Sequence, residues 1–200
     1  DTSRNSMFAN ITSTAGNEFT LHNGSGLHNP AWWYFNITDN AAGQDVSFHA
    51  SHGDSGYRYV YSYDDITWHR FDSATGTEND ITFSETFTFN NVQIAQKWPY
   101  GYDDLQRDIK RYSKSAYASV SILGNTAYNR SIYRIIITNT SIPRNEKSTI
   151  YMIGRQHAGE TQGNWQIKGL VEFLINTTNE TAQRYRNNYT FVIVPMINVD

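Results

Sequence analysis

The sequence contains no cysteine among its 200 residues, and this absence excludes several kinds of chemistry at once. Disulfide bonds, thiolate zinc sites and cysteine nucleophiles all require a residue that the chain lacks. A strong excess of one charge is missing too, because 19 acidic and 16 basic residues give a net charge of -3. Without a broad basic field, nucleic acid is not an expected partner. No apolar run reaches the roughly 18–20 residues that cross a bilayer, so no membrane span is expected.

Aromatic residues are abundant, with 14 Tyr, 10 Phe and 5 Trp, and they are enough to build a sizeable core. The length suits one large domain or two small ones. The first segment, residues 1–25, is polar, and we expect it to form an N-terminal arm or an edge strand. Residues 26–98 alternate apolar and polar positions in short runs, which predicts a small antiparallel β-sandwich. The expected strands cover residues 32–38, 46–52, 57–62, 68–71 and 81–89.

The pattern changes after Pro99, where strand-like and helix-like segments alternate through residues 99–200. Such alternation predicts a mostly parallel or mixed sheet with helices on both faces. The fold class is therefore α/β within this part and α+β overall. Helices are expected over residues 103–113, 161–176 and 180–186. Strands are expected over residues 116–123, 132–138, 149–153 and 189–196.

The most informative segment runs from Tyr151 to Leu174, where a strand expected to be buried leads through a tight turn into a helix. His157 and Glu160 are three residues apart at this junction, so their side chains can converge above the carboxyl edge of the sheet. An imidazole and a carboxylate at that spacing suit Zn²⁺, which takes N and O ligands at about 2.0–2.2 Å. Open α/β sheets also hold their ligands at this edge. The pair alone is a weak signal, since a surface His near a Glu is common.

The surrounding residues give the pair a context. The run RQHAGET (residues 155–161), followed by Trp165, Lys168 and Gly169, resembles the zinc-binding segment of the zinc metallocarboxypeptidases, and in particular their cytosolic carboxypeptidase-like branch. Ala158 stands where that branch has proline. The resemblance implies that His157 and Glu160 are two of three protein ligands of Zn²⁺. It also leaves Arg155 as a substrate contact, an orienting partner of Glu160 or a structural partner at the sheet edge.

Three further segments extend this resemblance over most of the chain. The segment YDDITWHRF (residues 63–71) and the run WPYGYDDLQ (residues 98–106) resemble the β-domain that precedes the catalytic domain in that branch. The strand YTFVIVPMINVD (residues 189–200) resembles the family's next core strand, with Val199 in place of the usual proline. The family's third zinc ligand, its carboxylate-binding Arg residues and its Glu general base come later. We therefore expect no catalytic residue within these 200 residues, and an inactive portion of an enzyme.

The family's activity gives the first functional hypothesis, which is zinc-dependent hydrolysis of the C-terminal bond of a peptide or protein. Eight Asn-x-Ser/Thr sequons, against about four expected from composition, favour an extracellular or cell-surface glycoprotein over a cytoplasmic protein. The alternative function is accordingly a secreted structural or recognition module that keeps the fold without catalysis and self-associates through an exposed sheet edge. The candidate acceptors are Asn10, Asn23, Asn36, Asn129, Asn139, Asn176, Asn179 and Asn188.

A second histidine pair, His49 and His52, is a poor candidate for a metal site. Residues i and i+3 of a strand face opposite sides of the sheet, so the two rings would not meet at one ion. The nearby GDSG run (residues 53–56) imitates a serine-protease motif but lacks the family contexts for a catalytic His and Asp, so we interpret it as a turn.

Overall fold

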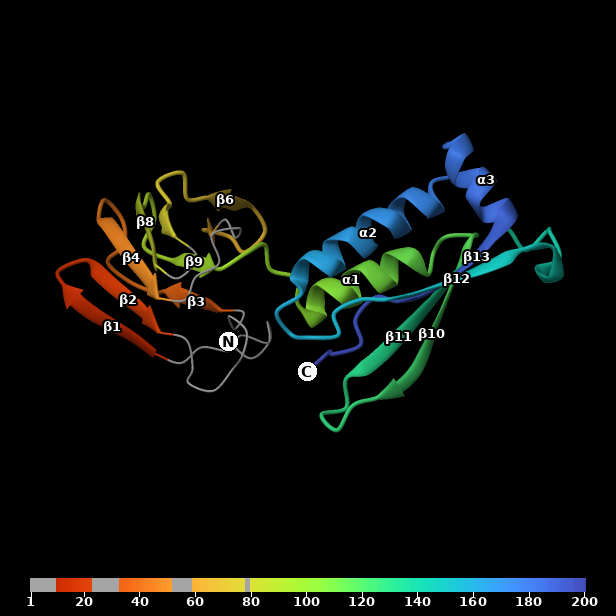
Figure 1. The fold of residues 1–200 in the computed structure, drawn as a ribbon, viewed down its shortest axis with the longest axis horizontal. Coiled ribbons are helices and arrows are strands. Elements are labelled where there is room, and N and C mark those ends of the chain that lie inside the picture. The colour runs from red at the N-terminus through yellow and green to blue at the C-terminus, as the bar shows by residue number, and fades with distance from the viewer. Residues whose placement is uncertain (1–9, 23–32, 52–58, 78–79) are drawn as a thin grey trace. The chain divides into compact units, whose positions relative to one another are not determined.

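The computed structural model describes residues 10–22, 33–51, 59–77 and 80–200 (Figure 1). The chain divides into two compact units, Asp1–Pro99 and Tyr100–Asp200, and each has its own hydrophobic core. His52, the GDSG run and the sequon at Asn23 lie outside the described residues.

The described residues of the first unit form two sheets of short strands. One sheet has the order β1-β2-β4-β8-β7 and the other has the order β3-β9-β5-β6. Every pair is antiparallel except β2 with β4, which is parallel. The strands are β1 Asn10–Ala15, β2 Glu18–His22, β3 Tyr34–Ile37, β4 Asp45–Ser51, β5 Val60–Ser62, β6 Trp68–Arg70, β7 Thr75–Thr77, β8 Asp80–Thr86 and β9 Val92–Ala95.

Aromatic side chains fill the space between these two sheets. Phe83 of β8 lies at the centre, stacked on Tyr59 with ring centroids 4.3 Å apart and on Phe48 of β4 at 5.2 Å. Trp33, just before β3, stacks on Tyr59 at 5.2 Å. Phe48 of β4 also contacts Phe35 of β3, with ring centroids 5.8 Å apart, so rings from both sheets meet and the unit is a β-sandwich with an aromatic core, as the sequence predicts.

The second unit is built on one mixed sheet with the order β10-β11-β13-β12. The strands are β10 Ala118–Asn125, β11 Ser131–Ile137, β12 Ser148–Ile153 and β13 Tyr189–Val194. β11 pairs antiparallel with both β10 and β13, and β12 pairs in parallel with β13, with Ile153 opposite Val194. The mixed sheet that the sequence predicts is therefore present, and the two parallel strands end at the same edge.

Three α-helices accompany this sheet: α1 Tyr102–Tyr112, α2 Thr161–Ile175 and α3 Glu180–Asn188. Helix α1 begins where the Asp104 carboxylate accepts a hydrogen bond from the Gly101 amide at 2.7 Å, and acidic residues in a first turn also favour the helix dipole. Helix α3 begins at Asn179, whose side-chain oxygen accepts from the Ala182 amide at 3.0 Å.

Helices α1 and α2 pack on one face of the sheet. Leu105 of α1 and Val171 of α2 share a buried cluster with Ile135, Ile137 and Ile193, which all point to that face. A short 3-10 helix, Arg144–Glu146, precedes β12. Among the residues that the structure describes, no helix combines the length and apolarity needed to cross a membrane.

The sequence predicts that β12, the strand before the candidate site, is buried, but the structure leaves it partly exposed. β12 is the last strand in the sheet order, and two of its side chains, Tyr151 and Ile153, are 60% and 50% exposed. Both lie on the face opposite α1 and α2, whereas Ile150 and Met152 point toward the helices and are partly buried. An apolar run at a sheet edge can thus be half exposed, which composition alone does not reveal.

Candidate metal site at the strand–helix junction

The candidate site lies in the loop between β12 and α2. Strands β12 and β13 run parallel, so the loop after β12 and the segment after β13 emerge at the same carboxyl edge of the sheet. The backbone pairing continues beyond the strands, because the Gly154 amide donates to Val194 O at 2.9 Å and Gly154 O accepts from the Ile197 amide at 3.0 Å. The loop therefore leaves the sheet in a fixed direction.

Gly154 is required by the closeness of its neighbours. A Cβ atom at this position would lie 2.4 Å from Ile167 Cδ1 of α2 and 2.6 Å from the backbone oxygen of Pro195. Any larger side chain would push the loop away from α2 or from the segment after β13. The glycine thus allows these three parts of the unit to meet at one point.

Arg155 follows in a left-handed backbone conformation, with φ of +51°. A non-glycine residue in this region costs roughly 1–2 kcal/mol, so surrounding contacts must hold it. The Arg155 side chain is buried, and its Nη1 donates to the backbone oxygen of Tyr100 and, at 3.3 Å, to Asn164 Oδ1. Burial lowers the pKa of the Arg155 guanidinium to about 10, opposed by the Asp104 and Glu160 carboxylates, so the group stays charged at neutral pH.

His157 and Glu160 meet at the exposed tip of this loop. His157 Nδ1 lies 2.8 Å from Glu160 Oε1, and the His157 amide donates to Glu160 Oε2 at 3.0 Å. The hydrogen bond from the His157 side chain lowers the pKa of Glu160, and the bond from the His157 amide adds to the effect. The two side chains are 76% and 51% exposed, so an ion from solvent can reach both donors.

The donor set fits one half of a zinc site. Two ligands of one tetrahedral ion at about 2.1 Å lie about 3.4 Å apart, so His157 Nδ1 and Glu160 Oε1, which are 2.8 Å apart in a direct hydrogen bond, would have to separate by about 0.6 Å to share one. A small opening of the pair would admit the ion, and the exposed surface leaves room for water. Within the described parts of the chain, no group of three or more His, Asp or Glu side chains that could hold a metal ion is found. His157 and Glu160 therefore supply two donors.

Two other histidines of the described residues, His49 and His22, do not form a comparable site. His49 on β4 pairs with Asp80 of β8 across the sheet, with Nε2 and Oδ1 2.6 Å apart. His22 Nε2 lies 2.9 Å from Thr12 Oγ1 in the β1–β2 hairpin. Neither pair is directly followed by a helix in the described residues, whereas the loop that carries His157 and Glu160 leads directly into α2.

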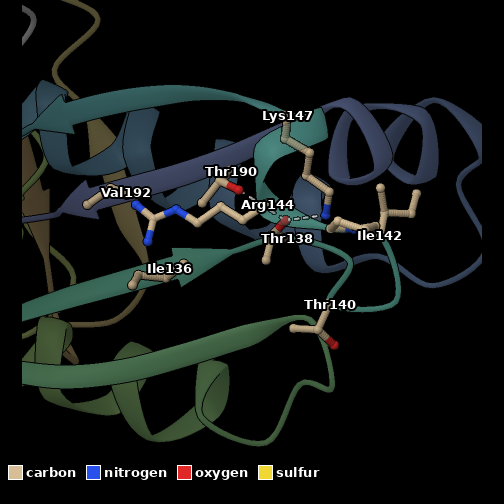
Figure 2. Close-up of a pocket in the computed structure, with 9 residues that line it drawn as sticks. Ile136, Thr138, Thr140, Ile142, Arg144, Lys147, Thr190 and Val192 are labelled. Atoms are coloured by element: carbon tan, nitrogen blue, oxygen red, sulfur yellow. Dashed lines mark hydrogen bonds between the residues drawn. The ribbon is translucent and has the colours of Figure 1, made fainter.

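A pocket of about 280 Å³ lies on the open face of the sheet in the second unit (Figure 2). Lys147 Nζ donates to Thr138 Oγ1 at 2.8 Å, and the Arg144 side chain extends along the sheet toward Val192. The lining has hydroxyls and two cations but no carboxylate, imidazole or thiol, so it lacks a general base and a metal ligand. It is lined by Ile136, Thr138, Thr140, Ile142, Pro143, Arg144, Lys147, Thr190 and Val192.

Several candidate glycosylation residues carry structural hydrogen bonds. Asn179 caps α3 through Ala182, and Asn139 Nδ2 donates to Asn187 Oδ1 at 2.9 Å. Asn176 Oδ1 accepts from the hydroxyl of Thr178 at 3.0 Å. These contacts give some of the asparagines a role in turns and helix starts that does not involve a glycan.

Sequence reasoning missed Asn164 as a member of the site. Its side chain is 1% exposed, accepts from Arg155 Nη1 and donates to the backbone oxygen of Pro195 at 2.8 Å. One signal for it exists in the sequence, because Asn164 stands four residues after Glu160 and three before Ile167, at the spacing of an inward helix face. A polar residue on such a face usually makes buried hydrogen bonds.

Comparison with known proteins identifies similar sequences. The family described as zinc carboxypeptidase matches residues 103–200. Cytosolic carboxypeptidase 2 of Xenopus tropicalis is 27% identical over 202 residues, covering 84% of this chain and 21% of that protein. Cytosolic carboxypeptidase 3 of Bos taurus is 26% identical over 202 residues, covering 84% and 20%. The chain thus spans about a fifth of the length of these curated relatives.

Solved structures give the same fold over nearly the whole chain. A metallo-carboxypeptidase from Burkholderia cenocepacia matches with a TM-score of 0.82 and 23% identity, covering 98% of this chain and 56% of that one. A metallo-carboxypeptidase from Pseudomonas aeruginosa, in complex with (2-guanidinoethylmercapto)succinic acid, matches with a TM-score of 0.78 and 21% identity, covering 95% and 52%. At these identities the likeness establishes the fold.

Proposed function

Because residues 103–200 of this chain belong to the zinc carboxypeptidase family, we propose that His157 and Glu160 are two zinc ligands of a metallocarboxypeptidase. The proposed reaction is hydrolysis of the C-terminal peptide bond of a peptide or protein. The observation that carries this proposal is the convergence of His157 Nδ1 and Glu160 Oε1, 2.8 Å apart, at the carboxyl edge of two parallel strands.

The chemistry divides between the ion and the chain. A bound Zn²⁺ supplies a Lewis acid and a water ligand whose pKa falls toward 7. Glu160 holds the His157 ring through Nδ1 and the His157 amide through its second carboxylate oxygen, so the two donors are oriented before an ion arrives. The lowered pKa of Glu160 keeps the carboxylate ionised, which is the form that binds a metal.

We also propose that these 200 residues bind the metal weakly and do not hydrolyse peptides by themselves. Catalytic zinc sites use three protein ligands, and the described residues group no third ligand with His157 and Glu160. The third ligand, the substrate-binding Arg residues and the general base would then come from additional sequence. Chelator-sensitive release of C-terminal amino acids by the 200-residue chain would contradict this part of the proposal.

Zinc titration of three variants tests the ligand assignment. His157→Ala and Glu160→Gln should each weaken Zn²⁺ binding by about tenfold or more, measured by isothermal titration calorimetry. His49→Ala is the matched control, since His49 is also an exposed histidine paired with an acid but lies in the first unit. Equal losses in all three variants, or no loss in any, would reject His157 and Glu160 as ligands.

We propose a cytoplasmic setting, because the curated relatives are cytosolic carboxypeptidases by name. The extracellular prediction rests on the sequons alone, and self-association stays a prediction. Expression in a eukaryotic host with a secretion signal, followed by treatment with a glycosidase, tests the sequons. A mass shift on deglycosylation of the protein from its native source would favour the extracellular location instead.

A further inference from the structure

Arg155 occupies a position that the proposed chemistry does not explain by itself. Arg155 is 2% exposed, while the side chain of His157, two residues later, is at the surface. Burying an arginine is unfavourable unless its donors are used. Nη1 donates twice, to Tyr100 O and to Asn164 Oδ1, whereas the buried Nε has no hydrogen-bond partner among the described residues.

The contacts of Arg155 join three separate parts of the second unit. Tyr100 precedes α1, and Asn164 belongs to the first turns of α2. The backbone oxygen of Arg155 accepts from the Asn198 amide at 3.1 Å, in the segment after β13. Asn164 completes the connection by donating to Pro195 O at 2.8 Å. Arg155 is thus hydrogen-bonded to the residue before α1, to α2 and to the segment after β13.

The left-handed conformation of Arg155 aims the rest of the loop. With φ of +51°, the chain turns sharply between the buried guanidinium and His157. Such a conformation persists only where the surroundings determine it, and here the determining contacts are those of the side chain itself and of its backbone oxygen. If the guanidinium contacts are lost, fewer hydrogen bonds stabilise the left-handed conformation of Arg155.

We infer that Arg155 is a positioning residue, which holds the loop so that His157 and Glu160 present their donors to one metal ion. It does so from beneath the site, without touching the ion or the substrate. This inference rests on the proposed function, because the metal is what the positioned donors would bind. It assigns to Arg155 the part that outer hydrogen-bond partners have in other metal sites.

A second buried arginine provides a matched control. Arg186 of α3 is 1% exposed, its Nη1 donates to Leu174 O and Asn176 O, and its guanidinium lies 3.9 Å from the ring centroid of Tyr117. It is therefore buried and bonded much as Arg155 is. It binds the far end of α2, about 20 Å from Glu160 along a helix that rises 1.5 Å per residue.

The test compares Arg155→Met, Arg155→Lys and Arg186→Met in the full 200-residue chain. The first readout is the backbone order parameter of residues 156–160 without metal, expected near 0.85 in the original chain and below about 0.6 in Arg155→Met. The second is the Zn²⁺ dissociation constant, expected to rise about tenfold in Arg155→Met. Arg186→Met should leave both readouts unchanged, although it lowers the thermal midpoint.

Each outcome decides the inference. Equal loop order in Arg155→Met and Arg186→Met, whether both are rigid or both are loose, would overturn it. Arg155→Lys keeps the charge with fewer donors and should fall between the original chain and Arg155→Met, and it decides the test if the methionine variant does not fold. If the original chain binds no Zn²⁺ through His157, the proposed function fails, while the metal-free order parameters still decide the role of Arg155.

Discussion

Replacing Gly154 with alanine is the most direct test of the packing beneath the loop between β12 and α2. The added methyl group would lie 2.4 Å from Ile167 Cδ1 and 2.6 Å from Pro195 O. The Ile167 methyl can rotate away, but Pro195 O is a backbone atom held by Asn164 Nδ2 at 2.8 Å. The strain must therefore be relieved by moving either the loop or the segment after β13.

Overpacking of this kind costs roughly 1–3 kcal/mol. Because a rotating side chain relieves only one of the two close contacts, we expect the free energy of unfolding to fall by about 2 kcal/mol. For a unit of about 100 residues, this corresponds to a decrease in the thermal midpoint of roughly 8–16 °C. The loss should concern the second unit, since both contacts lie within it.

Urea unfolding followed by amide hydrogen exchange on β13 measures this loss in the second unit alone. Gly169→Ala is the control, because a Cβ at Gly169 of α2 meets nothing within 4 Å. Alanine in an open helix position should stabilise the unit by about 0.5–1 kcal/mol. If Gly154→Ala were as stable as the original chain, the close approach of loop, helix and strand would not be the reason for this glycine.

Three further predictions concern other hydrogen bonds. Hydrogen bonds from backbone amides, chiefly that of Thr67, lower the pKa of Asp64 to about 2. The stability that the ionised Asp64 gives the fold is therefore present above pH 3.8 and is lost as the pH falls through 2. NMR titration of the Asp64 carboxyl measures this pKa, and an ordinary value near 3.9 would contradict the prediction. Lys168 Nζ lies 2.8 Å from the largely buried Asp108 carboxylate. Lys168→Met removes this cation from beside the Asp108 charge and should lower the free energy of unfolding in urea by about 2–3 kcal/mol. A change below about 0.5 kcal/mol would count against this ion pair. Asn179→Ala should destabilise the second unit by about 1 kcal/mol through loss of the helix cap, whereas Asn179→Gly should cost a few tenths.

The helices of the second unit could be predicted closely from the sequence. Helix α2 was expected over residues 161–176 and spans Thr161–Ile175, because its inward residues repeat at helical spacing. The prediction for α3 was short by two residues at its end, where polar residues give no periodic signal. Strong periodicity and a capping residue were enough to locate these elements.

Residues 1–25, predicted as an arm or an edge strand, contain the two strands β1 and β2, and strands β7 and β9 and one pairing could not be predicted either. β7 reads Thr-Gly-Thr, is fully exposed and owes its conformation to pairing with β8, so its composition indicated a turn. β9 has only four residues, yet it lies between β3 and β5 in the sheet order. The parallel pairing of β2 with β4 depends on contacts between segments distant in sequence. Such features are set by tertiary structure, which local patterns do not encode.

For the candidate site, the sequence indicated the two donors but not how they are supported. His157 and Glu160 were expected to converge, and the structure brings Nδ1 within 2.8 Å of Oε1. Arg155 remained open among three roles, because a one-dimensional pattern does not tell whether a long side chain points outward or inward. Its burial and its contact with Asn164 became visible only with the fold.

The segment after β13 is bonded to the loop between β12 and α2 through main-chain atoms, by the amides of Ile197 and Asn198. Any amino acid with a backbone N–H can make these two bonds, so related sequences are free to vary at both positions as far as this attachment is concerned. Proline is the exception, since it has no N–H to donate. Related sequences should therefore carry many different residues at positions 197 and 198, but not proline.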